Sequence, residues 1–185
     1  MSDLTITHGG VSVTKRSGGE VLSNNKKLGQ MNVDLIDVTC TSNSAAHTIG
    51  DIICEPIKIE NAVAVKGGAA ILQSAALIVG SGGQEVGAIT AVITNNGPTD
   101  LAGIAANDAW ASGSDALAVY DGFCGMFTFT NGVDAGAVTL HDKHNIGMVC
   151  KAEAGSTDLY IFLVAQSTDD YDGNNLVARL GFIKD

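Results

Sequence analysis

Short runs of alternating apolar and polar residues recur along the chain from residue 31 onward. The first run, residues 32–40, sets Val33, Leu35 and, less regularly, Val38 against Asp34 and Asp37, which is the pattern of a half-buried β-strand. Comparable runs bounded by Gly, Asn, Asp or Ser cover residues 48–59, 62–66, 70–79, 86–93, 117–120, 125–130, 137–140, 146–151, 158–165 and 176–183. About ten short strands with turn signals between them favour a two-sheet sandwich or a closed barrel over a βαβ arrangement. We predict an all-β protein, an antiparallel β-sandwich of jelly-roll-like topology.

The first thirty residues differ from the rest of the chain. They alternate only weakly and then become polar, with several Gly and Asn and no clear apolar period. We predict an extended N-terminal arm over residues 1–30 that orders on a partner, followed by a β-sandwich domain over residues 31–185. A frayed terminus fits the same residues.

One passage has helical character. Residues 101–110 are rich in Ala and follow Thr99 and Asp100, either of which is a suitable N-cap. A short helix and a loop that contains one helical turn both fit this passage.

The charge of the chain limits the kinds of partner. The net charge is −10, and the only basic clusters are Lys15-Arg16 and Lys26-Lys27. A nucleic-acid-binding surface needs clustered Lys and Arg, so no nucleic-acid partner is expected. The apolar runs are short and interrupted by Gly and polar residues, so no membrane partner is expected either.

The four cysteines are widely spaced and form no CxxC pair. Cys54, Cys124 and Cys150 lie in apolar runs, where a reduced cysteine packs as a small apolar side chain. The first residues lack the basic and apolar segments of a secretory signal peptide. We therefore expect free, buried thiols, with disulfides as the alternative.

Two polar clusters have the composition of metal sites. The segment 141–144 holds His141 and His144, but residues three apart lie on opposite faces of a strand, and we expect an exposed loop there. The segment 167–175 is rich in Asp, but the sixth and twelfth positions counted from Asp170 are Asn175 and Gly181, which do not fit a calcium loop. Neither GxGxxG, a phosphate-binding loop nor GxSxG is present. No catalytic, cofactor or metal site is therefore predicted, and the protein is not expected to be an enzyme.

The single tryptophan, Trp110, lies in the passage 101–110. A loop Trp on a β-sandwich can stack on a sugar, fold back over the core, or anchor a contact between subunits. We favour the subunit contact.

The end of the chain is its most specific feature. Residues 175–185 read NLVARLGFIKD, preceded by LYIFLVA at residues 159–165 and, earlier, by TIGDII at 48–53 and AILQSAALIV at 70–79. These segments resemble a family of small structural proteins of tailed bacteriophages, which carry a GD strand, a run like G-x-I-x-S-V-x-L and an ending like DL-x-V-R-L-G-I-x-x-D. The resemblance covers about residues 45–185. Residues 118–121, AVYD, depart from the bulkier strand of that family.

The resemblance implies a function without catalysis. Some members of the family are capsid decoration, or cement, proteins, which sit as jelly-roll-like homotrimers on the outer surface of the phage head. The expected partners are the major capsid protein and further copies of the chain, and the expected locations are the bacterial cytoplasm during synthesis and then the virion. A tail or fibre-associated virion component and a carbohydrate-binding β-sandwich that uses Trp110 are the alternatives.

The candidate contact residues are few, and no cofactor is among the expectations. In a regular last strand, Val177, Arg179 and Gly181 face away from the apolar residues between them. Arg179 then needs an acid on a neighbouring strand or on another subunit, and we expect a trimer contact there. The complete set of candidate subunit or capsid contacts is Lys15, Arg16, Lys26, Lys27, Trp110 and Arg179.

Overall fold

A computed structural model describes most of the chain. The described residues are 4–8, 11–15, 21–23, 26–27, 33–42, 46–80, 87–97, 101, 104–110, 121–130, 132–168, 171 and 175–184. The chain divides into two compact units, Met1–Asn32 and Val33–Asp185. Residues 117–120, which the sequence predicts as a strand, lie outside the described residues.

The first unit contains four short strands that pair in sequence order. They form one antiparallel sheet of β1 (Leu4–His8), β2 (Val11–Lys15), β3 (Val21–Ser23) and β4 (Lys26–Lys27). That residues 1–30 act as a partner-binding arm stays a prediction.

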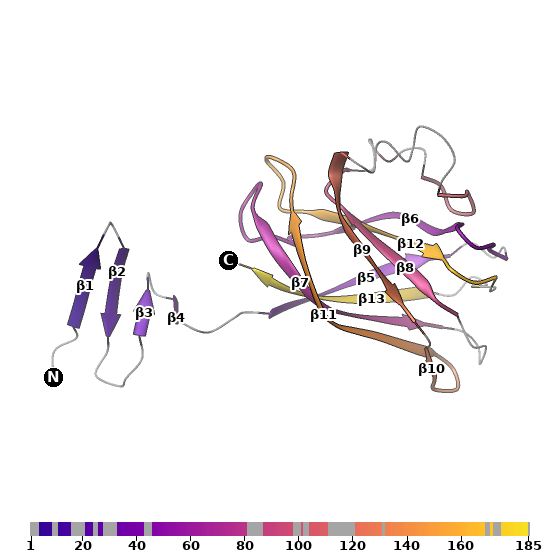
Figure 1. The fold of residues 1–185 in the computed structure, drawn as a ribbon, viewed down its shortest axis with the longest axis horizontal. Coiled ribbons are helices and arrows are strands. Elements are labelled where there is room, and N and C mark those ends of the chain that lie inside the picture. Colours follow the sequence, from indigo (N-terminus) through magenta and orange to yellow (C-terminus); the bar gives the residue numbers. More distant parts are fainter. Residues whose placement is uncertain are drawn as a thin grey trace. The chain divides into compact units, whose positions relative to one another are not determined.

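The second unit consists of two antiparallel sheets that enclose the core (Figure 1). Its strands are β5 (Val33–Thr41), β6 (Ile52–Ile59), β7 (Ala69–Val79), β8 (Ile89–Thr94), β9 (Phe123–Phe129), β10 (Val133–Asp134), β11 (Thr139–Lys151), β12 (Leu159–Ala165) and β13 (Asn175–Lys184). The five-stranded sheet has the order β10-β11-β7-β13-β5, and the four-stranded sheet has the order β6-β12-β8-β9. The predicted antiparallel β-sandwich is confirmed.

The strand pairs are nested. β5 pairs with β13, β6 with β12, β7 with β11, and β8 with β9, all antiparallel. The chain from β5 to β8 therefore runs against its own return from β9 to β13, and the strands alternate between the two sheets from β5 to β8 and again from β11 to β13. This is a long hairpin rolled into a sandwich, the jelly-roll topology that is also found in viral capsid and lectin domains.

Strand β13 has the two faces that its sequence predicts. Leu176, Ala178, Leu180 and Phe182 are buried in the core, whereas Arg179 is exposed. A fully buried Leu or Phe side chain stabilises a fold by about 1.5–3 kcal/mol, so this strand contributes strongly to the core.

A disulfide joins the two sheets along one edge of the sandwich. Cys40 of β5 and Cys54 of β6 are bonded across a Cα–Cα distance of 5.9 Å. Because β5 and β6 are edge strands of different sheets, the bond links the two layers. The expectation of free thiols is wrong for this pair and holds for Cys124 and Cys150.

Two local expectations about strands are corrected. Residues 62–66 form turns and bends instead of a strand, although Ala62 and Val63 are still buried. Most of the run 137–140 and all of the run 146–151 belong to one strand, β11, which begins at Thr139 and whose register shifts between His144 and Met148. Positive φ angles at Asn145 and Gly147 interrupt the alternation there, so the sequence reads as two strands.

The passage 101–110 is a loop and not a short helix in its described part. Hydrogen bonds from Leu101 N to Gly97 O and from Ile104 N to Leu101 O form single turns. The segment then extends, and Ala109 bridges to Asp51 beside β6.

Candidate interaction surfaces

The outer face of the five-stranded sheet carries an exposed apolar row across four strands. Val149 of β11 lies beside Ile71 of β7, Ile71 beside Ile183 of β13, and Ile183 beside Val33 of β5. Leu35, next on the same face of β5, is 65% exposed, and Val149 is 64% exposed. Apolar side chains that adjoin across strands form a continuous patch, which is a feature of interaction sites.

A second apolar row crosses the same face toward its other end. Leu140 of β11 pairs with Val133 of β10 and with Ile78 of β7, and Ile78 pairs with Val177 of β13. Val133 and Leu140 are exposed. We call the two rows together the outer apolar face; it comprises Val33, Leu35, Ile71, Ile78, Val133, Leu140, Val149, Val177 and Ile183.

A charged row separates the two apolar rows. Asp37 of β5 lies beside Arg179 of β13, Arg179 beside Ala76 of β7, and Ala76 beside Asp142 of β11. Charged side chains between two apolar rows can fix the register of a contact that the apolar rows make.

Arg179 forms a bidentate ion pair with Asp37. Its Nε and Nη2 donate to Asp37 Oδ1 and Oδ2, each at 2.8 Å. The hydrogen bond from Arg179 lowers the pKa of Asp37, and the same contact raises the pKa of Arg179. The acid on a neighbouring strand that the sequence calls for is therefore present, while the trimer contact at Arg179 stays a prediction.

Much of the outer face of the four-stranded sheet is covered by the chain itself, while Met126 of edge strand β9 stays exposed. Leu101 and Ile104 pack with Val92, Phe162 and Val164 in a second apolar cluster. Trp110 packs on this cluster, with its ring centroid 5.9 Å from that of Phe162 in an edge-to-face arrangement. Trp110 thus folds back over its own sheet, one of the alternatives weighed for it.

Backbone hydrogen bonds fix the loop that carries Trp110. Trp110 N donates to Gly50 O at 3.0 Å, Ile52 N donates to Asp108 O at 2.9 Å, and Asn107 N donates to Ile52 O at 2.8 Å. The loop thereby pairs with the start of edge strand β6. The indole Nε1 of Trp110 is buried and has no acceptor among the described residues.

An open groove of about 720 Å³ follows the disulfide edge of the sandwich. Its walls come from edge strands β5 and β6 and from the loop 105–106. Its lining residues are Thr39, Thr41, Ser42, Cys54, Glu55, Pro56, Ile57, Lys58, Ala105 and Ala106. Edge strands have backbone groups that can pair with an added strand, so the groove is a second candidate contact.

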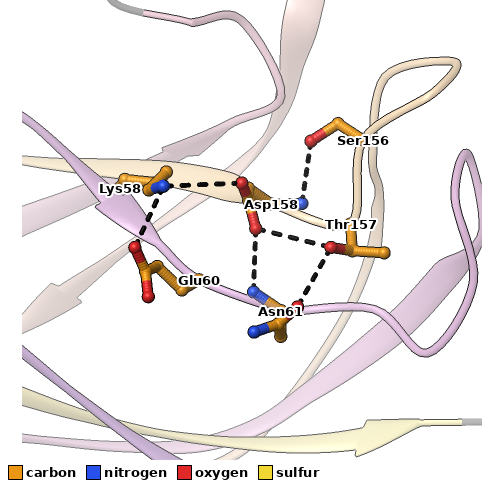
Figure 2. Close-up of polar contacts among 6 residues, drawn as sticks. All are labelled: Lys58, Glu60, Asn61, Ser156, Thr157 and Asp158. Carbon is orange, nitrogen blue, oxygen red and sulfur yellow. Dashed lines mark hydrogen bonds and ion pairs between the residues drawn. The ribbon is translucent and has the colours of Figure 1, made fainter.

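A polar network closes the sandwich where β6 ends and β12 begins (Figure 2). Asp158 Oδ1 accepts from Asn61 N at 2.9 Å, and Thr157 Oγ1 donates to Asn61 Oδ1 at 3.2 Å. Lys58 Nζ lies 3.0 Å from Glu60 and 3.8 Å from Asp158, and the contact with Glu60 raises the pKa of Lys58. These groups hold the turn at Asn61, which has a φ of 54°, and they serve the fold because they satisfy one another.

The two histidines of the segment 141–144 point to opposite sides of the sheet. His141 is buried in the sandwich, where burial lowers its pKa, and His144 is exposed and lies 2.8 Å from Asp142. The segment lies within β11, so the expectation of an exposed loop is wrong, whereas the opposite-face prediction is confirmed. No group of three or more His, Cys, Asp or Glu in the described part of the chain is arranged to hold a metal ion.

The other predicted contact residues lie in or near the first unit. Lys15 ends β2, Lys26 and Lys27 form β4, and Arg16 lies outside the described residues, as do Asp169 and Asp170 of the Asp-rich segment. The structure gives no test of these lysines as capsid contacts. Within the described residues, no helix has the length and hydropathy needed to cross a membrane.

The outer apolar face is the main feature that the sequence does not reveal. Val33 and Leu35 read as the core side of their strand, but Val38 and Cys40 are the buried residues and Val33 and Leu35 are exposed. Counting back two residues at a time from Cys40, through Val38 to Ile36, would have identified the residues of β5 that face the core.

Comparisons with known proteins identify no family for this chain. No protein-family model matches it, and no curated protein matches it. Among solved structures, a chain from Desmodium yellow mottle tymovirus aligns with 84% of this chain and 82% of its own length, at 14% identity and a TM-score of 0.25. Since a TM-score this low carries no weight, function is inferred from the chain's own residues.

Proposed function

We propose that this protein is a virion structural protein, a decoration protein that binds the outer surface of a phage head as a homotrimer. The observation that carries the proposal is the outer apolar face, which includes the last strand, β13. That strand is also the segment that most resembles the phage structural family.

The outer apolar face supplies the association energy in this proposal. Burial of apolar surface contributes roughly 25 cal/mol per Å², so covering the exposed side chains of this face favours association. The charged row through Arg179 and Asp37 orients that contact. Three weak capsid contacts on one trimer then reinforce each other through effective concentration.

The charge distribution supports a capsid contact through the first unit. Residues 1–32 hold four basic and two acidic side chains, whereas residues 33–185 hold six basic and 18 acidic ones. The first unit thus carries a net +2 and the second a net −12. In this proposal, Lys15, Arg16, Lys26 and Lys27 bind an acidic capsid surface, while the acidic sandwich keeps free copies soluble.

Pelleting with phage heads tests the function. The purified chain is mixed with heads of the phage that encodes it, and heads and free protein are separated by sedimentation. We expect the chain to pellet with heads and to add regularly spaced density to their outer surface. Recovery of all the chain in the supernatant would refute the decoration function, and density confined to tails would favour the tail-associated alternative.

Deletion of residues 1–30 separates capsid binding from folding. We expect the shortened chain to stay folded and trimeric but to bind heads weakly. A matched variant with Lys15, Arg16, Lys26 and Lys27 changed to Gln keeps the length of the chain and should show the same loss. Undiminished binding by both variants would remove the first unit from the proposal.

A further inference from the structure

Cys124 and Cys150 lie together at the edge of the sandwich opposite the disulfide. Cys124 belongs to β9, the edge strand of the four-stranded sheet that lies farthest from β6. Cys150 belongs to the end of β11, where β7 is the neighbouring strand within the sheet. Cys40 and Cys54 join the two sheets at the other edge.

The backbones of β9 and β11 approach each other closely at this pair. The Sγ atom of Cys124 lies 3.8 Å from the carbonyl oxygen of Lys151, the residue that follows Cys150. A Cβ atom on Gly125, next to Cys124, would come within 2.8 Å of the side chain of Met148. Glycine at position 125 therefore allows the contact that brings the two cysteines together.

The two thiols interact directly and differ in exposure. The thiol of Cys150 next to Cys124 lowers the pKa of Cys124 to about 7, and Cys124 together with burial raises the pKa of Cys150. Cys124 is half-buried, whereas Cys150 is fully buried. Cys124 therefore has the properties of an attacking thiolate, and Cys150 those of a resolving thiol.

We propose that Cys124 and Cys150 are a redox-active pair that closes to a second disulfide between the sheets when it meets a small-molecule disulfide. The Cys124 thiolate attacks one sulfur of that disulfide, forms a mixed disulfide and releases one thiolate. The sulfur of Cys150 then attacks the sulfur of Cys124, and its proton passes to the small thiolate that leaves Cys124. The protein loses two electrons and two protons, and the small disulfide is reduced to two thiols.

The second bond would close the remaining edge of the sandwich. With both edges linked, β5 is tied to β6 and β9 to β11, so the two layers can no longer separate at either side. The disulfide would form under oxidising conditions and hold the two sheets together at this edge, and it would be reduced again under reducing conditions.

Thiol counting and peptide mapping test the proposal on the full chain. The protein is incubated with oxidised glutathione at pH 8, alkylated in denaturant and digested. We expect its two free thiols to disappear and a linked peptide that contains Cys124 and Cys150 to appear. The melting temperature should rise by about 5–10 °C, since a disulfide that closes a loop of this length constrains the unfolded chain. Two thiols that persist, or a wild-type chain that stops at the mixed disulfide, would overturn the proposal.

Single variants test the two roles. Cys150→Ala should keep one glutathione on Cys124, because no resolving thiol remains. Cys124→Ser should leave Cys150 as a free thiol, because it is buried. Reaction of Cys150 in that variant at the wild-type rate would contradict the assigned roles. The rate of wild-type oxidation should increase between pH 6 and 8 with a midpoint near 7, the pKa of Cys124.

Discussion

The two sheets of the sandwich differ in what covers their outer faces. On the four-stranded sheet, Leu101, Ile104 and Trp110 pack on Ile52, Val92, Phe162 and Val164, while Met126 of edge strand β9 stays exposed. The five-stranded sheet also has apolar residues on its outer face, and Leu35, Val133 and Val149 remain exposed there.

Apolar residues on the outer face of a sheet can therefore have two different roles. Apolar outward positions that the chain covers itself contribute to the stability of one copy, and those that it leaves bare contribute only when a partner arrives. Substitutions on the covered face should therefore change folding, and substitutions on the bare face should change association.

The largest expected effect is on the covered face. Phe162→Ala should lower the free energy of unfolding by about 3–5 kcal/mol, because Phe162 is fully buried between its sheet and the loop. Denaturant titration measures the loss. The matched variant Ile71→Ala, on the bare face, should cost roughly 1 kcal/mol or less. Equal losses for the two variants would show that Ile71 is packed as tightly as Phe162, which would contradict an uncovered outer face on the five-stranded sheet.

A smaller and more local effect is expected at Leu101. Leu101→Ala should cost about 2 kcal/mol, because its buried side chain holds the loop to the sheet. Since Trp110 is the only tryptophan, its emission reports on this loop alone and should shift to longer wavelength. The exposed control Val65→Ala should leave both quantities unchanged. If Leu101→Ala loses the expected stability but the Trp110 emission does not shift, the loss does not arise from release of this loop.

Charge on the bare face should change association with little effect on folding. The double variant Leu35→Lys and Val149→Lys should sediment as a monomer at micromolar concentration, because six ammonium groups cannot be buried in a trimer contact. The free energy of unfolding of its monomer should stay within about 0.5 kcal/mol per substituted site of the wild-type value. If the double variant still sediments as a trimer, the outer apolar face is not the contact between subunits.

The smallest effect is the pH dependence of the exposed pair. The folded pKa of Asp37 is lowered by Arg179, so the stabilisation is present above the unfolded pKa, about 4, and is lost as pH falls through the folded value. Arg179→Gln should reduce the difference in denaturation midpoint between pH 7 and pH 3. Arg179→Lys, which keeps the charge, should retain part of it. A pH profile unchanged by Arg179→Gln would exclude the pair as its source.

Local alternation was sufficient to predict the all-β class and most strands. In β13 it also identified the buried face correctly, because the apolar residues recur at every second position through Phe182. Long-range pairing is what local patterns lack. The partnership of Cys40 with Cys54 depends on two edge strands that meet only in the folded sandwich.

The candidate surface was harder to predict for a physical reason. Both sides of β5 carry apolar residues near its start, so alternation alone does not say which side meets the core. In β11, the irregularity at Asn145 and Gly147 conceals one long strand behind two short patterns. The face that these strands build with β7 and β13 appears only once their register is known.

The position of β13 has a consequence for the order in which the protein folds. β13 comes after all the other described strands in the sequence, yet it lies between β7 and β5 in the interior of its sheet. Its partners are distant in sequence, as in the pairing of Ile183 with Val33. Contacts of such separation slow folding. Until β13 is inserted, the facing edges of β5 and β7 stay unpaired and can pair with strands of other chains.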